Sequence, residues 1–563
     1  MKRMLVFVVL VLFGATAAAD THSDKSARLF DAAMKGDISG VRSALDDGAD
    51  LNSKHTSKNI SALWIASEAG HLKVVRLLLS RGAEVDAENS ASGTTALWVA
   101  SQNGHTGIVA QLLKAGANAD PKMKSTGVNA LWMASQNGHA EIVHLLLKAG
   151  IDPNSRDRVY GRTALWKAAQ NNHVHVVELL LNKGAKVDAL HARHHTTALW
   201  MASQNGHAEV VRRLLENGAD TEIRDADFQA TALWVASQNG HAQTVKHLLE
   251  KGADVDARCK KADTTPLWKA AYEGRTAVVK LLLENSADPN TRNTSKGSTP
   301  FIIASSEGHL KVVQLFLAHG VNIEAKDTAN GATALWAASQ NGHAEVVRLL
   351  LGKNANVNAK HAMEDITPLW AASQNGHTQV VQLLLAGGAV VDAKRRGFGT
   401  TALWMASQNG HEKIVALLLN RGAGLEVKRK SDGMTPLLMA SNGGHEGVVK
   451  QLLNKGADVN VQATSDGATA LWMAANKGDA GIAGLLLEKG ANANAKGGRY
   501  GATALLAAVN QGKARLVKLL IDHGADVNAS STINHAVWTP LKLAKQRGLK
   551  QIVRMLQKAG AGR

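Results

Sequence analysis

Histidine is the residue type whose spacing in this 563-residue chain most directly suggests chemistry, because imidazole binds metals and transfers protons near neutral pH. Eleven histidines recur at intervals of 34 or 68 residues, namely His71, His105, His139, His173, His207, His241, His309, His343, His377, His411 and His445. Zinc needs ligand nitrogens that converge on one ion at ~2.0–2.1 Å, whereas equivalent residues of stacked repeats stand about a helix diameter apart. The regular spacing therefore argues against a row of metal sites.

A closer group, His191, His194 and His195, lies within one short loop, where three imidazoles could converge on a metal ion. The same loop contains no cysteine or carboxylate to complete a typical ligand set. We therefore expect solvated loop histidines, with a metal site as the alternative. The sequence predicts no metal, no cofactor and no catalytic residue.

The single cysteine, Cys259, lies between Arg258 and Lys260. Adjacent cations favour the thiolate, but no second cysteine exists for an internal disulfide. We expect an ordinary exposed thiol, and an intermolecular disulfide is the testable alternative.

Catalytic motifs are absent from the sequence: it has no Gly-rich phosphate loop, GxSxG, HExxH or CxxC. The recurring polar residues repeat many times along the chain, whereas an active site exists once. We therefore expect a protein that is not an enzyme. An active site within the irregular last repeats is the alternative.

Tryptophan sets the same register as histidine. Eleven of the twelve tryptophans fall 34 or 68 residues apart, namely Trp64, Trp98, Trp132, Trp166, Trp200, Trp234, Trp268, Trp336, Trp370, Trp404 and Trp472. Ile302 and Leu438 fill the skipped positions, Phe30 and Leu506 extend the series, and Lys542 closes it two residues late. This series predicts sixteen repeats that fill residues 20–563 as one array. We expect each indole to pack in the core and to bridge to the next repeat, against the alternative of a stacking surface for ligands.

Each repeat predicts two short helices. The repeat around Trp200 reads TTALWMASQNGHAEVVRRLLENGA, in which threonine is a good N-cap and glycine ends each helix. The second segment has apolar residues at i, i+1, i+4 and i+5. Neither helix is long enough to be stable alone in water, so neighbouring repeats must cover each other's apolar faces.

The motifs TALWxAS, GH, VV, LLL and GA resemble the ankyrin-repeat pattern TPLHxAA, GH, VV, LLL and GA. The period is 34 instead of 33, and tryptophan replaces the histidine of TPLH. The resemblance covers nearly the whole chain after its first residues. It implies an all-α repeat fold, an ankyrin-like solenoid of helix-turn-helix units with projecting loop or β-turn fingers. It also implies that the recurring histidine is a hydrogen-bonding residue at the helix junction.

The N-terminus reads MKRMLVFVVLVLFGATAAAD, with two basic residues, an apolar run and small residues. This pattern is typical of a signal peptide, which we assign to residues 1–19. The apolar run is too short to span a membrane, and the rest of the sequence predicts no transmembrane segment. We therefore expect an exported protein, periplasmic or extracellular.

The positive charge is concentrated in the fingers, defined here as the eight residues that lie eleven to four positions before each tryptophan-series position (Ala529–Trp538 in the last repeat). The chain has a net charge of +17, or +15 without residues 1–19, and the fingers carry +14 of it. The candidate partner-binding residues of the fingers are Lys122, Lys124, Arg156, Arg158, Arg258, Lys260, Lys261, Lys394, Arg395, Arg396, Lys428, Arg429 and Lys430. Such a charge attracts acidic proteins, anionic glycans or lipid headgroups. Nucleic acid is disfavoured by the export signal.

Gln-Asn pairs recur before the glycine of the first helix, on the expected concave floor of the solenoid. Candidate binding pairs are Gln136 and Asn137, Gln204 and Asn205, Gln238 and Asn239, Gln340 and Asn341, and Gln374 and Asn375. Identical amides in many repeats indicate either a periodic ligand or recent duplication with solvated amides, and we favour duplication.

Together these patterns predict a secreted or periplasmic scaffold that binds a partner protein, expected to be acidic, through fingers and inner helices. It would mask, inhibit or chaperone that partner. The alternative is an envelope or surface binder of polyanions that uses the basic fingers.

Overall fold

The computed structural model describes residues 21–55, 59–498, 500–533 and 536–562. The chain divides into two compact halves, Met1–Lys261 and Ala262–Arg563, each considered by itself below. The expected signal peptide, residues 1–19, lies outside the described residues.

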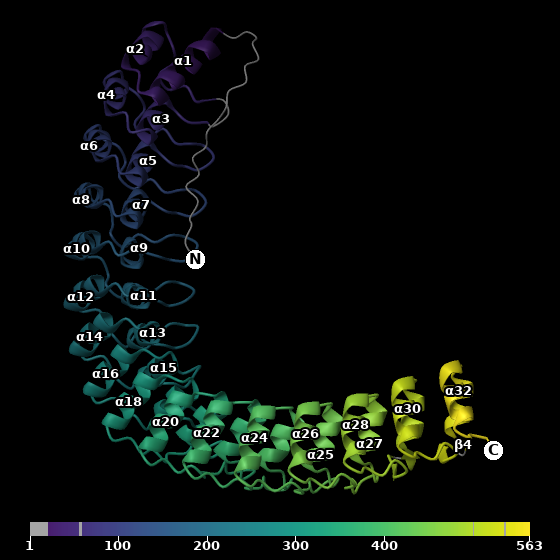
Figure 1. Ribbon diagram of the computed structural model, residues 1–563. Helices are drawn as coiled ribbons and strands as arrows, with labels where there is room; N and C mark the ends of the chain where they lie inside the picture. The colour runs from purple at the N-terminus through teal and green to yellow at the C-terminus, as the bar shows by residue number, and fades with distance from the viewer. Residues whose placement is uncertain (1–20, 56–58, 499, 534–535, 563) are drawn as a thin grey trace. The chain divides into compact units, whose positions relative to one another are not determined.

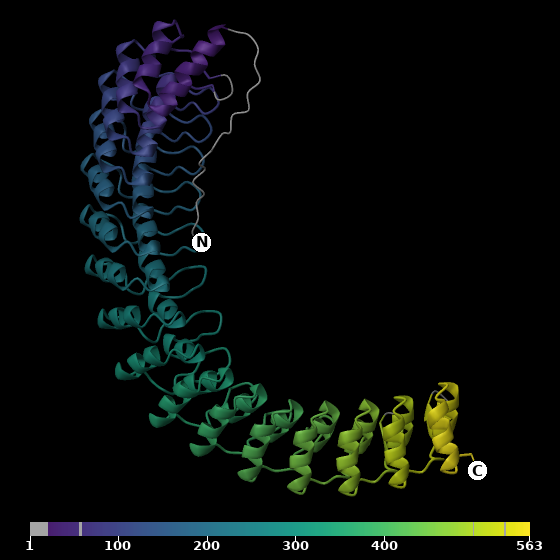
Figure 2. The same ribbon diagram turned by 45° about the horizontal axis from the view of Figure 1, so that its top comes forward.

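The N-terminal half contains fourteen described helices in seven pairs (Figure 1). They are α1 (Thr21–Lys35), α2 (Ile38–Asp46), α3 (Ala62–Glu68), α4 (Leu72–Ser80), α5 (Ala96–Asn103), α6 (Thr106–Lys114), α7 (Ala130–Asn137), α8 (Ala140–Lys148), α9 (Ala164–Gln170), α10 (Val174–Asn182), α11 (Ala198–Asn205), α12 (Ala208–Glu216), α13 (Ala232–Asn239) and α14 (Ala242–Glu250). The odd-numbered helix of each pair is called inner and the even-numbered helix outer. The inner column lies between the outer column and the projecting fingers (Figure 2).

The described part of the C-terminal half contains nine helix pairs and two short hairpins. The helices are α15 (Pro266–Tyr272), α16 (Thr276–Glu284), α17 (Pro300–Ser306), α18 (Leu310–Ala318), α19 (Ala334–Asn341), α20 (Ala344–Gly352), α21 (Pro368–Asn375), α22 (Thr378–Ala386), α23 (Ala402–Gln408), α24 (Glu412–Asn420), α25 (Pro436–Gly443), α26 (Glu446–Asn454), α27 (Ala470–Lys477), α28 (Ala480–Glu488), α29 (Ala504–Asn510), α30 (Ala514–Asp522), α31 (Pro540–Gln546) and α32 (Lys550–Lys558). The strands are β1 (Lys496–Gly497), β2 (Ala502–Thr503), β3 (Ser531–Ile533) and β4 (Ala536–Trp538). Strand β1 pairs antiparallel with β2, with Lys496 opposite Thr503, and β3 pairs antiparallel with β4, with Ser531 opposite Trp538. The predicted all-α repeat solenoid is confirmed.

Local sequence signals start and stop the inner helices as expected. Thr197 caps α11 by accepting a hydrogen bond from the backbone N–H of Trp200, and Gly206 ends it in the left-handed conformation. Thr299 caps α17 in the same way, and Pro300 occupies its first turn.

Six of the eleven indoles of the series are buried in the core, as predicted, and the other five, Trp64, Trp200, Trp268, Trp336 and Trp472, are half-buried. Trp98 is 4% exposed and Trp404 is 2% exposed. Each also bridges to the next repeat, because Nε1 of Trp98 donates to the carbonyl of Val128 at 3.1 Å and Nε1 of Trp404 donates to that of Met434 at 2.8 Å. In these two repeats the tryptophan therefore fills the core and joins its inner helix to the next finger.

The Gly-His motif interlocks consecutive repeats. The imidazole of His343 lies on the backbone of Gly308, so close that a Cβ at Gly308 would stand 2.4 Å from Nδ1. Nε2 of the same histidine donates to the carbonyl of Ser306 at 2.8 Å. The predicted helix-junction hydrogen bond is thereby confirmed, and the adjacent glycine is needed for this close approach.

We expect Gly308→Ala to destabilise the C-terminal half clearly more than Gly320→Ala. Both residues have positive φ, +78° and +73°, so each alanine costs about 1 kcal/mol of backbone strain. Only Gly308 faces His343, since nothing lies within 4 Å of a Cβ at Gly320, and overpacking adds ~1–3 kcal/mol. Urea unfolding followed by circular dichroism measures the difference. Equal losses would contradict the interlock.

Candidate partner-binding surface

The fingers are held to one another by backbone hydrogen bonds. The N–H of Arg158 donates to the carbonyl of Thr126 at 2.7 Å, and the N–H of Arg396 donates to that of Glu364 at 2.7 Å. Each finger thus supports the next, so that charged side chains on successive fingers keep fixed positions.

Of four candidate cations in the N-terminal half, Lys124, Arg156 and Arg158 contact a neighbouring finger, whereas Lys122 contacts an acidic residue of its own repeat. Lys122 lies 3.3 Å from Asp120, and Lys124 lies 3.4 Å from Glu88. Arg156 donates to the carbonyl of Leu190 at 2.7 Å, and Arg158 donates to that of Lys124 at 3.3 Å. These four cations are therefore both exposed and part of the scaffold.

The cluster near the end of this half is arranged differently. Arg258 is half-buried, whereas Lys260 and Lys261 are exposed. The Lys261 ammonium lies 5.3 Å from the ring centre of Phe228, an exposed aromatic residue of the preceding finger.

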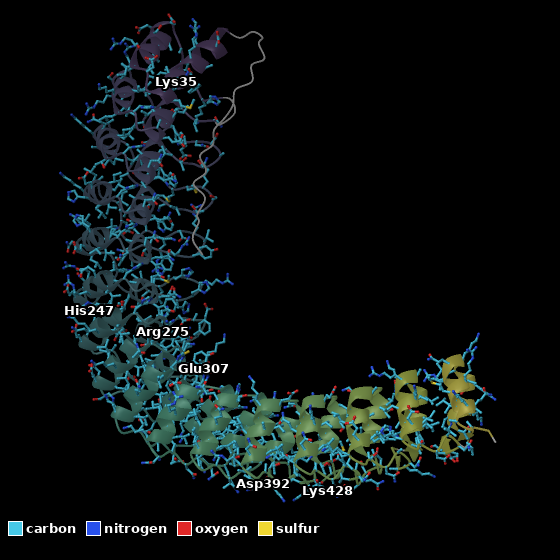
Figure 3. The ribbon with its side chains drawn as sticks, in the orientation of Figure 1. Lys35, His247, Arg275, Glu307, Asp392 and Lys428 are labelled. Carbon is cyan, nitrogen blue, oxygen red and sulfur yellow. The ribbon has the colours of Figure 1, made fainter. Side chains whose placement is uncertain are left out.

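The cations of two consecutive fingers in the C-terminal half separate into paired and unpaired groups. Arg395 contacts Glu364 at 2.6 Å and Arg396 contacts Asp365 at 2.7 Å, while Arg429 pairs with Asp432. The unpaired group comprises Lys394, Lys428 and Lys430, which are exposed and form no ion pair within the described residues. Figure 3 shows Lys428 at the finger edge of this half.

The asparagine of each Gln-Asn pair is part of the scaffold. Nδ2 of Asn137 donates to the carbonyl of Gln102 at 2.8 Å, and Nε2 of His139 donates to the same oxygen at 3.1 Å. The equivalent asparagine bonds connect Asn205 to Gln170, Asn239 to Gln204, Asn341 to Ser306 and Asn375 to Gln340. The side-chain amide of each of these asparagines therefore joins its repeat to the preceding one.

Two interpretations of finger residues were wrong. Cys259 is fully buried, and its Sγ donates to the carbonyl of Phe228 at 3.1 Å, so it is no exposed thiol. His191 is 5% exposed, and its Nδ1 accepts from the backbone N–H of Arg193 and of His194, both at 3.2 Å. His194 meets Asp227 of the next finger at 2.6 Å. The described residues contain no cluster of three or more histidine, cysteine, aspartate or glutamate side chains that could hold a metal.

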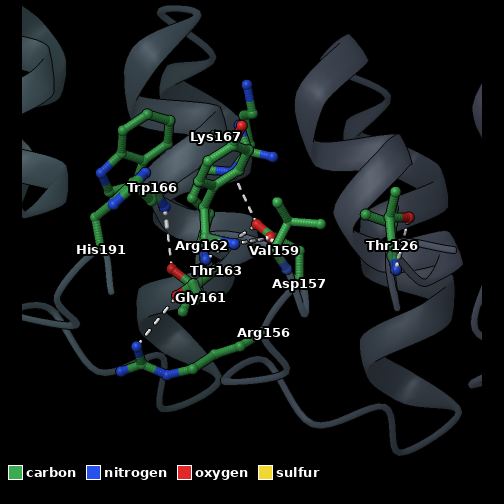
Figure 4. A network of polar contacts seen from close by, with 12 residues as sticks. Thr126, Arg156, Asp157, Val159, Gly161, Arg162, Thr163, Trp166, Lys167 and His191 are labelled. Atoms are coloured by element: carbon green, nitrogen blue, oxygen red, sulfur yellow. Dashed lines mark hydrogen bonds and ion pairs between the residues drawn. The ribbon is translucent and has the colours of Figure 1, made fainter. Parts of the chain in front are cut away.

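A buried carboxylate organises one finger of the N-terminal half (Figure 4). Asp157 is 3% exposed and accepts from the backbone N–H groups of Val159, Tyr160 and Arg162 at 2.7–3.0 Å. Nε of Arg162 also donates to it, at 2.8 Å. Burial alone would raise the pKa of Asp157, yet the hydrogen bonds from Arg162 and Tyr160 bring it below its usual value.

Lys167, on α9, lies beside this pair. Its ammonium is 5.3 Å from the ring centre of Trp132 and 5.5 Å from that of Trp166, and it donates to Oε1 of Gln170 at 2.8 Å. Burial, together with the charge of Arg162, lowers the pKa of Lys167 to about 8. A lysine on the inner column is thus partly deprotonated at mildly alkaline pH.

The family model described as "Ankyrin repeats (3 copies)" matches nine overlapping stretches, residues 8–89, 29–125, 86–157, 131–225, 199–293, 267–361, 358–429, 422–497 and 494–562. Together they span nearly the whole chain. The chain belongs to the ankyrin-repeat family. Ankyrin repeats are scaffolds for protein–protein interaction, and the chain is therefore a protein-interaction scaffold. No curated protein matches the chain.

Within these ankyrin repeats, the candidate residues inferred from the sequence did not include Asp157, Tyr160, Arg162 or Lys167. The signal for Lys167 was present, because the residue after the tryptophan position is apolar in both neighbouring repeats, Met133 and Met201.

No helix among the described residues is long and apolar enough to cross a membrane.

Lys167→Met should stabilise the N-terminal half by ~1–3 kcal/mol at pH 7, because it removes a desolvated charge. The pKa of Lys167 is about 8 in the folded chain against the usual 10.5, so the unfolded state binds more protons between these values. The free energy of unfolding of the wild-type protein therefore increases as pH rises from about 8 to 10.5. The difference in this free energy between the variant and the wild type becomes smaller over the same range. Paired urea titrations across this pH range measure this difference. A constant difference would contradict the lowered pKa.

Proposed function

We propose that this ankyrin-repeat protein is exported and binds an acidic partner protein, which it masks, inhibits or chaperones by covering its surface. The observation that most supports this proposal is the unpaired group, Lys394, Lys428 and Lys430, which is exposed on two consecutive fingers. Unpaired cations held at fixed positions attract and orient an acidic surface, and they raise the association rate at low salt. Paired arginines beside them keep the fingers in place.

Export is supported by the composition of residues 1–19 alone. A fusion of these residues to a reporter enzyme that is active only outside the cytoplasm tests it. Activity that requires the apolar run supports export, and an intracellular, uncleaved fusion contradicts it.

The partner is identified by using the full chain as bait in material from the compartment to which it is exported. Titration calorimetry with the purified candidate then gives the stoichiometry. We expect one dominant acidic protein in a fixed ratio to the chain. Binding only to polymers of unrelated chemistry would contradict a protein-specific scaffold.

A polyanion binder is the second candidate, favoured by the concentration of the positive charge in the fingers, which carry +14 of the +15 outside residues 1–19. Heparin, polyglutamate and vesicles with anionic lipid are suitable probes. Raising salt from ~0.1 M to ~1 M shortens the Debye length from about 10 Å to about 3 Å, so such binding should be lost. Binding that survives high salt would exclude this candidate.

A further inference from the structure

The residue after the tryptophan position normally closes the junction between a finger and its inner helix with apolar contact. Val99, for example, packs in one cluster with Val128 of the next finger and Trp132. Lys167 occupies this position in the repeat that follows Met133, and it is partly buried there. A cation therefore stands where the neighbouring repeats place a methionine.

Positive charge exceeds negative charge at this junction. Arg162 and Lys167 both lie over the ring of Trp132, at 5.4 Å and 5.3 Å from its centre. Asp157 is the carboxylate that pairs with Arg162, and three backbone N–H groups already occupy its oxygens. The Lys167 ammonium has the neutral Gln170 as its acceptor. One positive charge is left without a counter-charge at the junction.

The shared indole also carries an unused donor. Trp132 is 6% exposed, and within the described residues its Nε1 has no hydrogen-bond partner. A buried donor without an acceptor costs free energy. Above the junction, the exposed ring of Tyr160 stacks on the Arg162 guanidinium at 4.6 Å.

We propose that Lys167 and Arg162 form a subsite that receives one carboxylate of an aspartate or glutamate side chain on the partner protein. One uncompensated positive charge matches the single charge of a carboxylate better than the roughly two negative charges of a phosphate monoester. The role of the subsite rests on the proposed partner-binding function, whereas the affinity for a carboxylate does not.

The charged groups that act on Lys167 are Arg162 and Asp157 of the same repeat, and both also act on His191 of the next finger. A bound carboxylate favours the protonated amine and so makes Lys167 less reactive toward acylating reagents. Lys269 is a matched control, because it occupies the same repeat position but already pairs with Glu273 at 2.7 Å.

The first experiment measures the rate at which trinitrobenzenesulfonate labels Lys167 and Lys269 of the full chain near pH 8, by peptide mass spectrometry. Sodium acetate is compared with sodium chloride at equal ionic strength. We expect acetate to slow labelling of Lys167 roughly twofold, as a rise of about 0.5 in a pKa of about 8 would at pH 8, and to leave Lys269 unchanged.

Arg162→Thr, which introduces the residue that Thr94 and Thr196 place at the equivalent position two repeats before and one repeat after, should abolish the protection by acetate. No slowing at Lys167, or equal slowing at both lysines, would overturn the subsite. Protection by inorganic phosphate and not by acetate would overturn the carboxylate assignment.

The second experiment selects displayed random peptides on the full chain and on Lys167→Met, a substitution that copies Met133 and Met201. We expect acidic residues to be enriched on the wild type and this enrichment to fall on the variant. Equal enrichment on both would overturn the role of Lys167 in partner recognition. Failure to enrich any peptide, with the acetate effect intact, would contradict the proposed partner-binding function and uphold the carboxylate site.

Discussion

Asp157→Ala should unfold its finger locally and cost about 3 kcal/mol. The carboxylate is buried and holds the backbone N–H groups of Val159, Tyr160 and Arg162, so alanine leaves buried donors unsatisfied and removes the partner of the Arg162 guanidinium. This loss of stability is at the lower end of the range for breaking a buried ion pair, because the Arg162 side chain is 21% exposed and can turn to water. Amide hydrogen exchange across residues 155–162 measures the local loss even when the repeats unfold in stages.

Asp157→Asn is the matched control. Asn89 occupies the same position two repeats earlier, and its Oδ1 accepts from the N–H groups of Ala91 and Ser92 at 2.9 Å and 3.2 Å. Asparagine therefore keeps the oxygen that accepts from Val159 and Tyr160, and it loses the charge and the second oxygen, which accepts from Arg162. We expect a cost of about 1–2 kcal/mol, smaller than that of alanine. If the alanine and asparagine variants exchanged at the same rate, the organising role of the carboxylate oxygens would be wrong.

Reversing the charge of the unpaired group, Lys394→Glu, Lys428→Glu and Lys430→Glu together, should weaken binding of the acidic partner roughly 100-fold. Each contact at an exposed rim contributes up to ~1 kcal/mol, and three independent contacts add to about two decades in Kd. The fold should be unaffected, because these side chains are exposed and form no ion pair within the described residues. Titration calorimetry with the purified partner at low salt measures the change.

The control for charge alone is the triple variant Lys413→Glu, Lys450→Glu and Lys455→Glu. These lysines are exposed on or next to the outer helices α24 and α26, and the net charge changes by the same amount. We expect the control to retain most of the affinity. Equal losses in the two triple variants would mean that the partner responds to the net charge of the chain and does not bind at the finger edge.

The helix pairs and the burial of the indoles could be predicted from the sequence, because a period of 34 with Thr, Trp, Gly and His at fixed offsets specifies caps, core and junction together. The environment of Cys259 and His191 could not. Both occupy the position that Asp157 has in its finger, where the loop turns back on itself and buries the side chain. The residues beside a loop position in the sequence show which charges lie near it along the chain. They do not show whether the loop folds over that side chain and buries it.

The charge of the fingers was predictable in sum but not in detail. Arg395 and Arg396 pair with Glu364 and Asp365, which lie 31 residues earlier on the preceding finger. A count of charges within each finger does not detect such contacts between fingers. The structure therefore divides the predicted basic residues into those that hold neighbouring fingers together and the unpaired group, which is free to bind a partner.

Hydrogen exchange of the full chain with and without its purified partner tests the central claim most directly, because it locates the recognised surface without any substitution. We predict slowed exchange in fingers 393–400 and 427–434 and little change in α24 and α26. Protection confined to the outer helices, with the fingers unaffected, would contradict a binding surface formed by the basic fingers.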